Sequence, residues 1–508
     1  MKNFYYHLSL LKSSLSTYFS SEKYLHSERF SYPHECIAFS TDTPDDYGIL
    51  LSIDEFDRYL QITTNKKRKQ LGNVLDVTPT QGEKSTKYKH QLRRWKGSAI
   101  VNNIKGAELD EETLEIRAEF SDIYRIDLTG GGNKFDPLMG KETEDDLYAV
   151  AKLLLYEPNE RDPAFTQRGI KMLRFLLMAA RIAEIPPFLF VRKASQWGIN
   201  TLAKEINRID KNLAKRLVDG DYNANKDYRD NKYVTDSWDS LTSRLEPFLT
   251  ENVVKSLTGS DFRIMDILMG ERPVTIYLNW PESKLFALQP VMKLLWGTFT
   301  SELKNTYDNL VKLHGKRIAS RFRKILFLID EGGVTPVPEL YNHVSTLAGR
   351  GMSFEIGIQD LSQLDALYGK DHAKTILNNC VQVFSRQQSF ETAEYVSKLL
   401  GGKSAFSSSH TTHGEERSEG KQEQKIPLMT PQAIRGMGET ILIFHPDLRY
   451  PIRAKRMPEF VKPEVIPDYP RLLPPAPEIP LLPAPRVDTW RRASEAYPVF
   501  FTEQASQL

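Results

Sequence analysis

A run of five apolar residues that ends in two adjacent carboxylates constrains the fold of this chain more than any other feature. The run extends from Ile325 to Ile329 and continues directly into Asp330 and Glu331. Continuous apolar runs are typical of strands buried on both faces of a parallel sheet, and ligands lie just beyond the carboxyl ends of such strands. This is the pattern of a Walker B strand, in which the first acid holds Mg²⁺ and the second orients or activates a water molecule. A core strand with two solvated acids at its end is the alternative interpretation.

Length and composition narrow the class of protein. A chain of 508 residues predicts two or three packed units rather than one core. Because the net charge is only +2, affinity for nucleic acid would have to come from local basic patches. Cys36 and Cys380 lie far apart without metal-type spacing, which argues against a disulfide framework or a zinc site. No segment approaches the roughly 20 apolar residues of a membrane span, so we expect a cytoplasmic protein, either soluble or docked at the inner face of the membrane through partners.

The order of the predicted elements indicates an α/β fold. Strand-like runs at 72–77, 95–101, 121–128 and 273–279 are separated by helix-length gaps, which predicts crossover connections and a mainly parallel sheet. Later runs at 354–360, 381–385 and 440–445 continue the series. The segment between the runs at 121–128 and 273–279 shows helical spacing and almost no strand signals, so we expect an inserted all-α domain there.

These patterns divide the chain into five parts. We expect an N-terminal segment at 1–45, a nucleotide-binding domain in two parts at 46–143 and 263–458, an all-α insertion at 144–262 and a proline-rich tail at 459–508. The segment from Ser404 to Lys425 is rich in Ser, Thr, Gly, Glu and Lys, which predicts a mobile loop. The prolines of the tail exclude a regular helix or a central strand there.

A nucleotide site on this sheet needs a loop whose backbone amides close on phosphates at the start of a helix. The candidate loop is 78–86, in which Lys84 and Ser85 fit the phosphate and Mg²⁺ roles, but Thr78 and Glu83 replace the two usual glycines. The Glu83 charge would repel a phosphate about 4 Å away by about 1 kcal/mol in water and by about 4 kcal/mol at an effective dielectric of 20. Whether ATP is bound and hydrolysed therefore stays open, and an inactive nucleotide-binding fold is the alternative. The predicted nucleotide contacts are Thr80, Gly82, Lys84, Ser85 and Thr86, and the predicted Mg²⁺ ligands are Ser85 and Asp330.

An ordered series of motifs carries a family resemblance. The motifs are the run from Trp95 to Glu108, Phe-Asp-Pro-Leu at 135–138, Leu-Phe-Leu-Ile-Asp-Glu at 326–331, Ala-Gly-Arg-Gly-Met-Ser at 348–353, the run 357–369, Ile-Leu-Asn-Asn-Cys at 376–380, the run 391–401 and Pro-Leu-Met-Thr-Pro at 427–431. Over roughly residues 70 to 458 this series resembles type IV coupling proteins, the TraG/TraD-like conjugation ATPases. So many motifs in one order are far more specific than any one of them.

The resemblance implies a RecA-like P-loop nucleotide-binding domain interrupted by an all-α domain. It also implies a homo-hexameric ring that uses ATP and Mg²⁺, and that recruits DNA with a relaxase, or a secreted protein, to the ATPases and membrane components of a type IV secretion system. The catalytic residues carried over by position are Glu331, Gln359, Arg350 and Arg386. The two arginines are candidates for reaching a neighbouring subunit's phosphates, and an ordinary ion pair is the alternative for either.

Three departures from the family pattern qualify this expectation. The loop glycines are lost, Asn103 stands where an acid is frequent, and the usual N-terminal transmembrane pair is absent from the sequence. We therefore expect a soluble, divergent member of the family, an ATPase that translocates single- or double-stranded DNA. A catalytically weak or nucleotide-independent adaptor that recruits substrates to the channel is one alternative, and a hexameric DNA-pumping motor of the same superfamily is another.

Two kinds of surface are candidates for partners. Basic stretches at 66–69, 87–96 and 316–324 would suit the phosphate backbone of a nucleic acid, although each is more commonly a solvated face. Tyrosines and a tryptophan alternate with cations between Tyr222 and Trp238, which favours a docking site for a substrate or accessory protein. Local packing of these aromatic rings between helices is the alternative.

Overall fold

A computed structural model describes residues 28–42, 45–62, 72–79, 84–104, 108–155, 163–413 and 416–458. The basic stretch 66–69, the loop residues Thr80, Gly82 and Glu83, and the segments 1–27 and 459–508 lie outside the described residues. No described helix combines the length and the apolar character that crossing a membrane requires.

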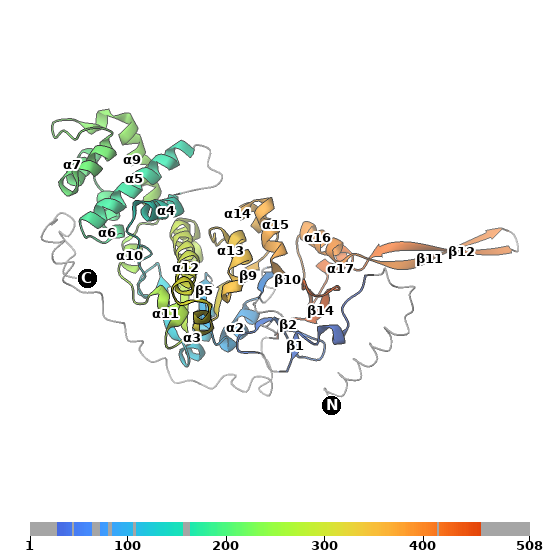
Figure 1. Ribbon diagram of the computed structural model, residues 1–508. Helices are drawn as coiled ribbons and strands as arrows, with labels where there is room; N and C mark the ends of the chain where they lie inside the picture. Colours follow the sequence, from blue (N-terminus) through green and yellow to red (C-terminus); the bar gives the residue numbers. More distant parts are fainter. Residues whose placement is uncertain are drawn as a thin grey trace.

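A sheet of 12 strands forms the body of the molecule (Figure 1). Seven neighbouring strands run parallel, because each is reached by a crossover through helices. In spatial order these strands are β10 (Cys380–Phe384), β4 (Asn73–Val77), β9 (Met352–Ile358), β8 (Ile325–Ile329), β5 (Ser98–Asn103), β7 (Val274–Asn279) and β6 (Asp122–Asp127). The predicted α/β class and the mainly parallel sheet are confirmed.

Antiparallel strands extend one side of this sheet beyond β10. They are β13 (Thr440–Phe444), β14 (Ile452–Lys455), β2 (Ile49–Ile53), β3 (Tyr59–Ile62) and β1 (Ser40–Thr41). The sequence predicted only β13 among them. The tight turn between β2 and β3 is built on Asp54, whose carboxylate accepts from the backbone N–H groups of Phe56 and Arg58, and such a turn joins antiparallel neighbours.

Helices cover both faces of the parallel strands. Alternate residues of β8 point to opposite faces, so Leu326 and Leu328 pack with residues of α2 (Lys84–Arg94) and α3 (Glu108–Ala118), whereas Phe327 packs with α12 (Leu285–His314). The Trp296 ring of α12 lies 6.2 Å from the Phe327 ring. Shorter elements complete the sheet's connections: η2 (Pro33–Cys36), η4 (Glu282–Lys284), η5 (Lys316–Arg321), α13 (Leu340–Thr346), η6 (Ala348–Arg350), α14 (Ser362–Tyr368), α15 (Lys370–Asn378), α16 (Phe390–Leu400) and α17 (Pro431–Arg435).

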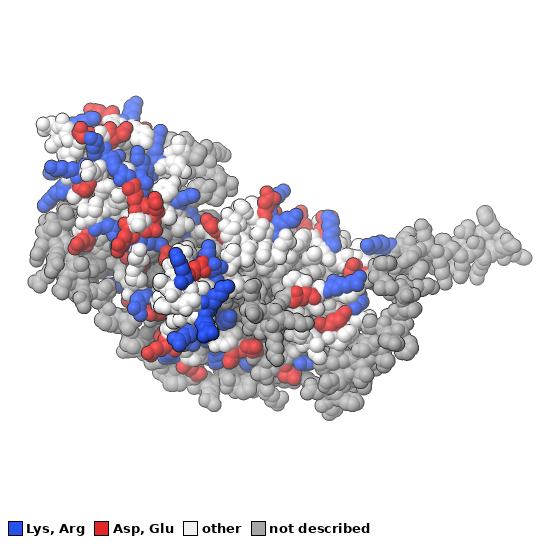
Figure 2. Space-filling model, viewed as in Figure 1, with Lys and Arg blue, Asp and Glu red and all other residues white. Residues whose placement is uncertain are grey.

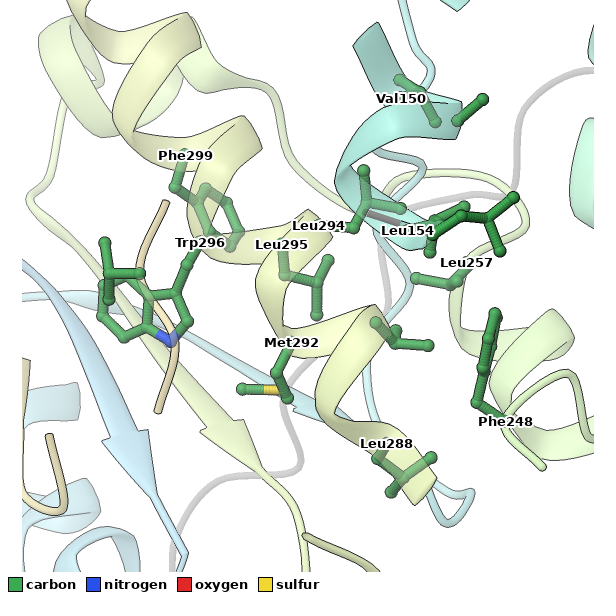
Figure 3. Packing of buried hydrophobic residues seen from close by; sticks show 14 of the residues in the cluster. Val150, Leu154, Phe248, Leu257, Leu288, Met292, Leu294, Leu295, Trp296 and Phe299 are labelled. Atoms are coloured by element: carbon green, nitrogen blue, oxygen red, sulfur yellow. The ribbon is translucent and has the colours of Figure 1, made fainter. Parts of the chain in front are cut away.

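Between β6 and β7 the described chain is helical. The helices are α4 (Glu144–Leu155), α5 (Pro163–Ile182), α6 (Pro187–Ala194), α7 (Ile199–Ile209), α8 (Lys211–Val218), η3 (Tyr228–Asp230), α9 (Lys232–Leu245), α10 (Glu251–Ser256) and α11 (Ile264–Met269). Figure 3 shows Val150 and Leu154 of α4 beside Leu294 of α12, with Phe248 and Leu257 close by. One hydrophobic core therefore runs from the sheet through α12 into this helical region.

Aromatic residues expected to face a substrate mostly pack inside the helical region. The Tyr228 and Trp238 side chains are buried, and the Trp238 Nε1 donates to the Trp197 carbonyl at 2.9 Å. Tyr222 stacks on Tyr228 with 5.9 Å between ring centroids. Of the four rings in this stretch, only Tyr233 is exposed, so local packing explains most of this composition.

The segment predicted as a loop at 404–425 is instead a two-stranded hairpin. The strand β11 (Gly402–His413) pairs antiparallel with β12 (Glu416–Pro427) along its whole length, and the hairpin projects from the body beside α16 and α17 (Figure 1). The ladder pairs the backbone N–H and C=O groups of the two strands. The polar composition of the segment gave no strand signal.

Candidate functional site

The site lies where three parallel strands end at the same edge of the sheet. The strand β9 lies between β4 and β8, so the carboxyl ends of these strands converge. Lys84 begins α2 after β4, Asp330 and Glu331 follow β8, and Gln359 follows β9. Backbone hydrogen bonds hold these ends together: Thr78 N–H donates to the Ile358 carbonyl at 2.9 Å.

Glu331 is the centre of this site. Lys84 Nζ lies 3.1 Å from Glu331 Oε2, and Gln359 Nε2 donates to Glu331 Oε1 at 3.1 Å. The Lys84 and Glu331 residues are 8% and 5% exposed. Each carboxylate oxygen therefore has a partner from a different strand end, which holds the Glu331 side chain in one orientation. The structure brings together three residues that are 247 and 28 positions apart in sequence.

A glycine in β9 makes the close approach of α2 possible. A Cβ built on Gly357 would lie 2.4 Å from the Tyr88 hydroxyl oxygen, 2.6 Å from the Asp330 carbonyl oxygen and 3.2 Å from Lys84 Cδ. The Gly357 carbonyl also accepts from the backbone N–H of Gly332 at 2.6 Å. A side chain at position 357 would push Lys84 away from Glu331, since backbone atoms on the other side cannot give way.

The remaining predicted nucleotide and Mg²⁺ residues surround Glu331 in part. Asp330 is buried at the end of β8. Ser85 and Thr86 are half-buried in the first turn of α2, and the N-terminal end of a helix favours an anion. The described residues contain no group of three or more His, Cys, Asp or Glu side chains that could hold a metal ion. The predicted oxygen donors for a divalent cation are the Ser85 hydroxyl and the Asp330 carboxylate.

The two predicted arginines lie at opposite edges of the sheet. Arg386 is exposed and follows the carboxyl end of β10, next to β4. Arg350 precedes the start of β9, and its guanidinium holds Asp308 of α12 through two hydrogen bonds of 2.8 and 2.9 Å. Within one chain, Arg350 is therefore far from Glu331.

A buried ion cluster next to the site was missed by sequence reasoning. Lys87 Nζ lies 2.7 Å from both carboxylate oxygens of Asp76 and 3.0 Å from Glu355 Oε1. Burial raises the pKa of Glu355 to about 7, although Lys87 opposes this shift. Burial would lower the pKa of Lys87, but Asp76 and Glu355 raise it above its ordinary value.

This cluster corrects the expectation that the basic stretch 87–96 faces a nucleic acid. Lys87 lies inside the protein, on the face of α2 that packs on β4 and β9. An acid in the middle of a buried strand needs a partner, so Asp76 within the apolar run 73–77 was the signal that could have found this cluster.

A second buried polar group was also missed. Asn103 Nδ2 donates to Asp110 Oδ1 at 2.9 Å and to Asn279 Oδ1 at 3.1 Å, and Arg125 lies 2.7 Å from Asp110 Oδ2. The Asp110 side chain is fully buried. A carboxylate is thus present beside Asn103, the position at which the sequence lacks the acid that its resemblance implied.

The strand order and the contacts of Glu331 define a RecA-like P-loop fold. Two solved structures of the bacterial conjugative coupling protein TrwB support this class. The unbound form of TrwBdeltaN70 superposes with a TM-score of 0.60, at 15% identity over 86% of this chain and 93% of that chain. TrwB in complex with the non-hydrolysable ATP analogue ADPNP superposes with a TM-score of 0.59, at 15% identity over 87% and 97% of the two chains.

Sequence comparison identifies the family. Residues 91–472 match the family described as Type IV secretory system Conjugative DNA transfer, and the chain belongs to it. Two Escherichia coli proteins named conjugal transfer protein TraG are similar at 27% identity over 189 residues and 26% over 190 residues. Each alignment covers 35% of this chain and 29% of the relative. The chain therefore aligns with less than a third of each relative's length.

Proposed function

We propose that this chain is an ATP-driven coupling protein that recruits DNA, or a protein substrate, and moves it toward a type IV secretion channel. The observation that carries the proposal is the assembly of Lys84 and Gln359 on the two oxygens of a buried Glu331. Family membership and the nucleotide complex of the structurally similar TrwB support it. Thr78 and Glu83 stand at the positions of the usual loop glycines, whereas Lys84 and Gln359 both contact Glu331.

Each residue of the site would have its own role in ATP hydrolysis. Lys84 would bind the β- and γ-phosphates of ATP, and Glu331 would orient the attacking water while Gln359 fixes its carboxylate. Thr80, Gly82 and Thr86 would contribute the phosphate loop. The Ser85 hydroxyl and the Asp330 carboxylate are oxygen donors of the kind that Mg²⁺ prefers, and bound Mg²⁺ would neutralise charge on the phosphates.

A phosphate bound at Lys84 would compete with Glu331 for the Lys84 ammonium group. Lys84 Nζ donates to Glu331 Oε2 at 3.1 Å, and both groups are buried. A phosphate would take over the Lys84 charge and leave Glu331 free for water. We propose that this exchange couples ATP binding to activation of the site.

The wider organisation is part of the same proposal. The nucleotide-binding domain would comprise 46–143 and 263–458, with 144–262 as a substrate-recognising insertion and 1–45 and 459–508 as flanking segments. Six copies would form a ring that docks at the inner face of the membrane through secretion ATPases and membrane components. A relaxase with its DNA, or a secreted protein, would be the cargo.

Titration of Mg-ATP into the purified protein tests this function. We expect saturable micromolar binding and DNA-stimulated turnover in the wild type, with binding lost in Lys84→Ala and turnover lost but binding kept in Glu331→Gln. Lys89→Ala is the matched control, because Lys89 lies on the same helix but pairs with Glu108 and Glu112. Absence of wild-type binding at millimolar Mg-ATP would contradict the proposal.

A nucleotide-independent adaptor is the second candidate. The replacement of the loop glycines favours it, since a side chain at the second glycine position obstructs close approach of the backbone to phosphate. For an adaptor, Lys84→Ala and Glu331→Gln would leave capture of DNA and partner proteins unchanged. Parallel pull-down with the wild type and these two variants separates the two functions.

A further inference from the structure

The basic stretches that the sequence predicts as candidates for nucleic-acid binding differ in whether their cations form ion pairs with acids of the chain. In the stretch 87–96, Lys87 pairs with Asp76 and Glu355, and Lys89 pairs with Glu108 and Glu112 at 2.7 Å each. Cations with such partners have little charge left for a ligand. Lys87 therefore holds α2 on the sheet, and Lys89 holds α2 on α3.

The stretch 316–324 differs because most of its cations are exposed and none of them forms an ion pair among the described residues. Four cations at the end of α12 and in η5 are exposed: Lys312, Lys316, Arg317 and Arg321, named here the η5 patch. The sequence has no acid between Asp308 and Asp330, and Asp308 is already held by Arg350. Among the ion pairs of the described residues, none includes a member of the η5 patch. Figure 2 shows Lys and Arg side chains gathered over the end of α12 and η5.

The backbone beneath the patch is firmly held. Arg323 donates from its guanidinium to the carbonyls of Gly270 and Glu271 at 3.0 and 2.6 Å, and from its backbone N–H to the Leu268 carbonyl at 2.9 Å. The Phe322 ring packs against Tyr307 with 4.9 Å between centroids. The exposed cations are thus presented by an ordered turn, so a ligand would not have to order it on binding.

The position of the patch connects it to the candidate site. The strand β8 begins at Ile325, directly after the patch, and ends at Asp330 and Glu331. Five residues of strand span roughly 17 Å. A ligand on the patch and a phosphate at Glu331 would therefore contact opposite ends of the same strand.

We propose that the η5 patch binds the phosphate backbone of the transported DNA. The inference rests on the proposed function, which it extends by naming the surface that holds the substrate. Clustered cations that pair with no acid in the described part of the chain suit a polyanion, because each phosphate contact releases counter-ions from the DNA. Between Asn309 and Lys324 the only strongly exposed large apolar side chain is Leu313, whereas docking on a bilayer needs an apolar face as well as charge.

Fluorescence anisotropy with labelled single-stranded and duplex oligonucleotides tests the patch. The variant is Lys316→Gln/Arg317→Gln/Arg321→Gln, and the control is Lys370→Gln/Lys374→Gln/Arg435→Gln, which removes three exposed cations elsewhere. We expect the variant to bind about tenfold or more weakly near physiological salt, with a salt slope shallower by about 0.9 per lost duplex contact. The control should stay within about twofold of the wild type, since removal of exposed charges away from the binding surface deletes no phosphate contact.

Other outcomes would overturn the proposal in distinguishable ways. Equal losses of DNA affinity in the patch variant and the control variant would show that only the net charge matters. Equal DNA affinity in the patch variant and the wild type would show that the patch does not bind DNA. A patch variant that loses binding to anionic phosphatidylglycerol vesicles but keeps DNA binding would assign the surface to the membrane. A wild type that binds Mg-ATP but no DNA would contradict the proposed function as well as the patch.

Discussion

Buried charged side chains lie directly beside the candidate site. Asp76 on β4, Lys87 on α2 and Glu355 on β9 form an ion cluster inside the sheet, one helical turn from Lys84. The Tyr88 hydroxyl adds a 3.2 Å hydrogen bond to Asp76. Breaking such a cluster by removing one partner leaves an uncompensated buried charge, which is strongly destabilising.

Glu355 predicts a dependence of stability on pH. Its pKa is raised from 4.5 to about 7 in the folded protein, so between these values the folded chain keeps a proton that the unfolded chain has released. Stability from this group is complete below the unfolded pKa and is lost as the pH rises through the folded pKa. We expect the wild type to lose stability between about pH 5 and about pH 8, and Glu355→Gln to lose less.

Chemical denaturation at several pH values measures this effect. The exposed Glu111→Gln serves as the control because it removes an acid from the surface of α3. We expect the free energy of unfolding of Glu111→Gln to fall with pH as it does in the wild type. If that of Glu355→Gln falls equally steeply, protonation of Glu355 does not stabilise the fold.

Among the elements, α12 connects the sheet to the helical region. Trp296 lies against Phe327 of β8, and the Phe299 ring stacks on Phe135 with 4.7 Å between centroids. A Cβ on Gly297 would lie 3.2 Å from Leu153 of α4 and 3.2 Å from Pro338. Close packing on both sides makes this 30-residue helix the common core of two parts of the chain.

Phe299→Ala is therefore expected to destabilise both parts together. Removal of a fully buried phenylalanine costs about 3–5 kcal/mol, and both parts share the cavity that it leaves. Leu313→Ala on the same helix should change stability by less than about 0.5 kcal/mol, since that side chain is 75% exposed. Denaturation of the two variants, followed by tryptophan fluorescence and by far-UV circular dichroism, measures both changes in stability. Separate transitions for the helical region and the sheet would contradict a shared core.

On the scale of the whole molecule, the proposed ring would bring an arginine of a neighbouring copy to the site. Arg386 is exposed at the same sheet edge as Glu331, whereas Arg350 would first have to leave Asp308. A ring would place one of these arginines of each copy against the phosphates bound by the next copy. An arginine of this kind contributes roughly 10³ to 10⁵ in turnover in related phosphate chemistry.

A mixing experiment tests this arrangement. We expect Arg386→Ala and Glu331→Gln each to abolish DNA-stimulated ATP turnover, and an equal mixture of the two to recover part of it. Recovery follows because some interfaces in a mixed ring combine an intact Glu331 with an intact Arg386. Arg350→Ala should match Asp308→Ala, with a small loss of stability, as expected for a partly exposed ion pair. Failure of the mixture to recover would exclude Arg386 as a residue acting between copies.

Local patterns in the sequence determined the parallel strands and the chemistry at their ends. The run 325–329 is apolar because both faces of β8 are covered, and this burial is visible without knowledge of any partner strand. Lys84 and Glu331 could likewise be placed near strand ends from local patterns. Gln359 was assigned only by the family resemblance, and its contact with Glu331 is seen only in the structure. The helical region was recognisable from its 3.6-residue period.

Pairings between distant residues were decided only by the tertiary structure. The antiparallel strands β14, β2, β3 and β1, and the polar hairpin of β11 and β12, depend on which backbone lies alongside. The same applies to charge. Lys87 and Lys316 both stand in basic runs, but Lys87 pairs with acids from two strands, whereas Lys316 pairs with no acid among the residues that the structure describes. Sequence determines which groups are charged or apolar, whereas three-dimensional packing determines which of them find a partner.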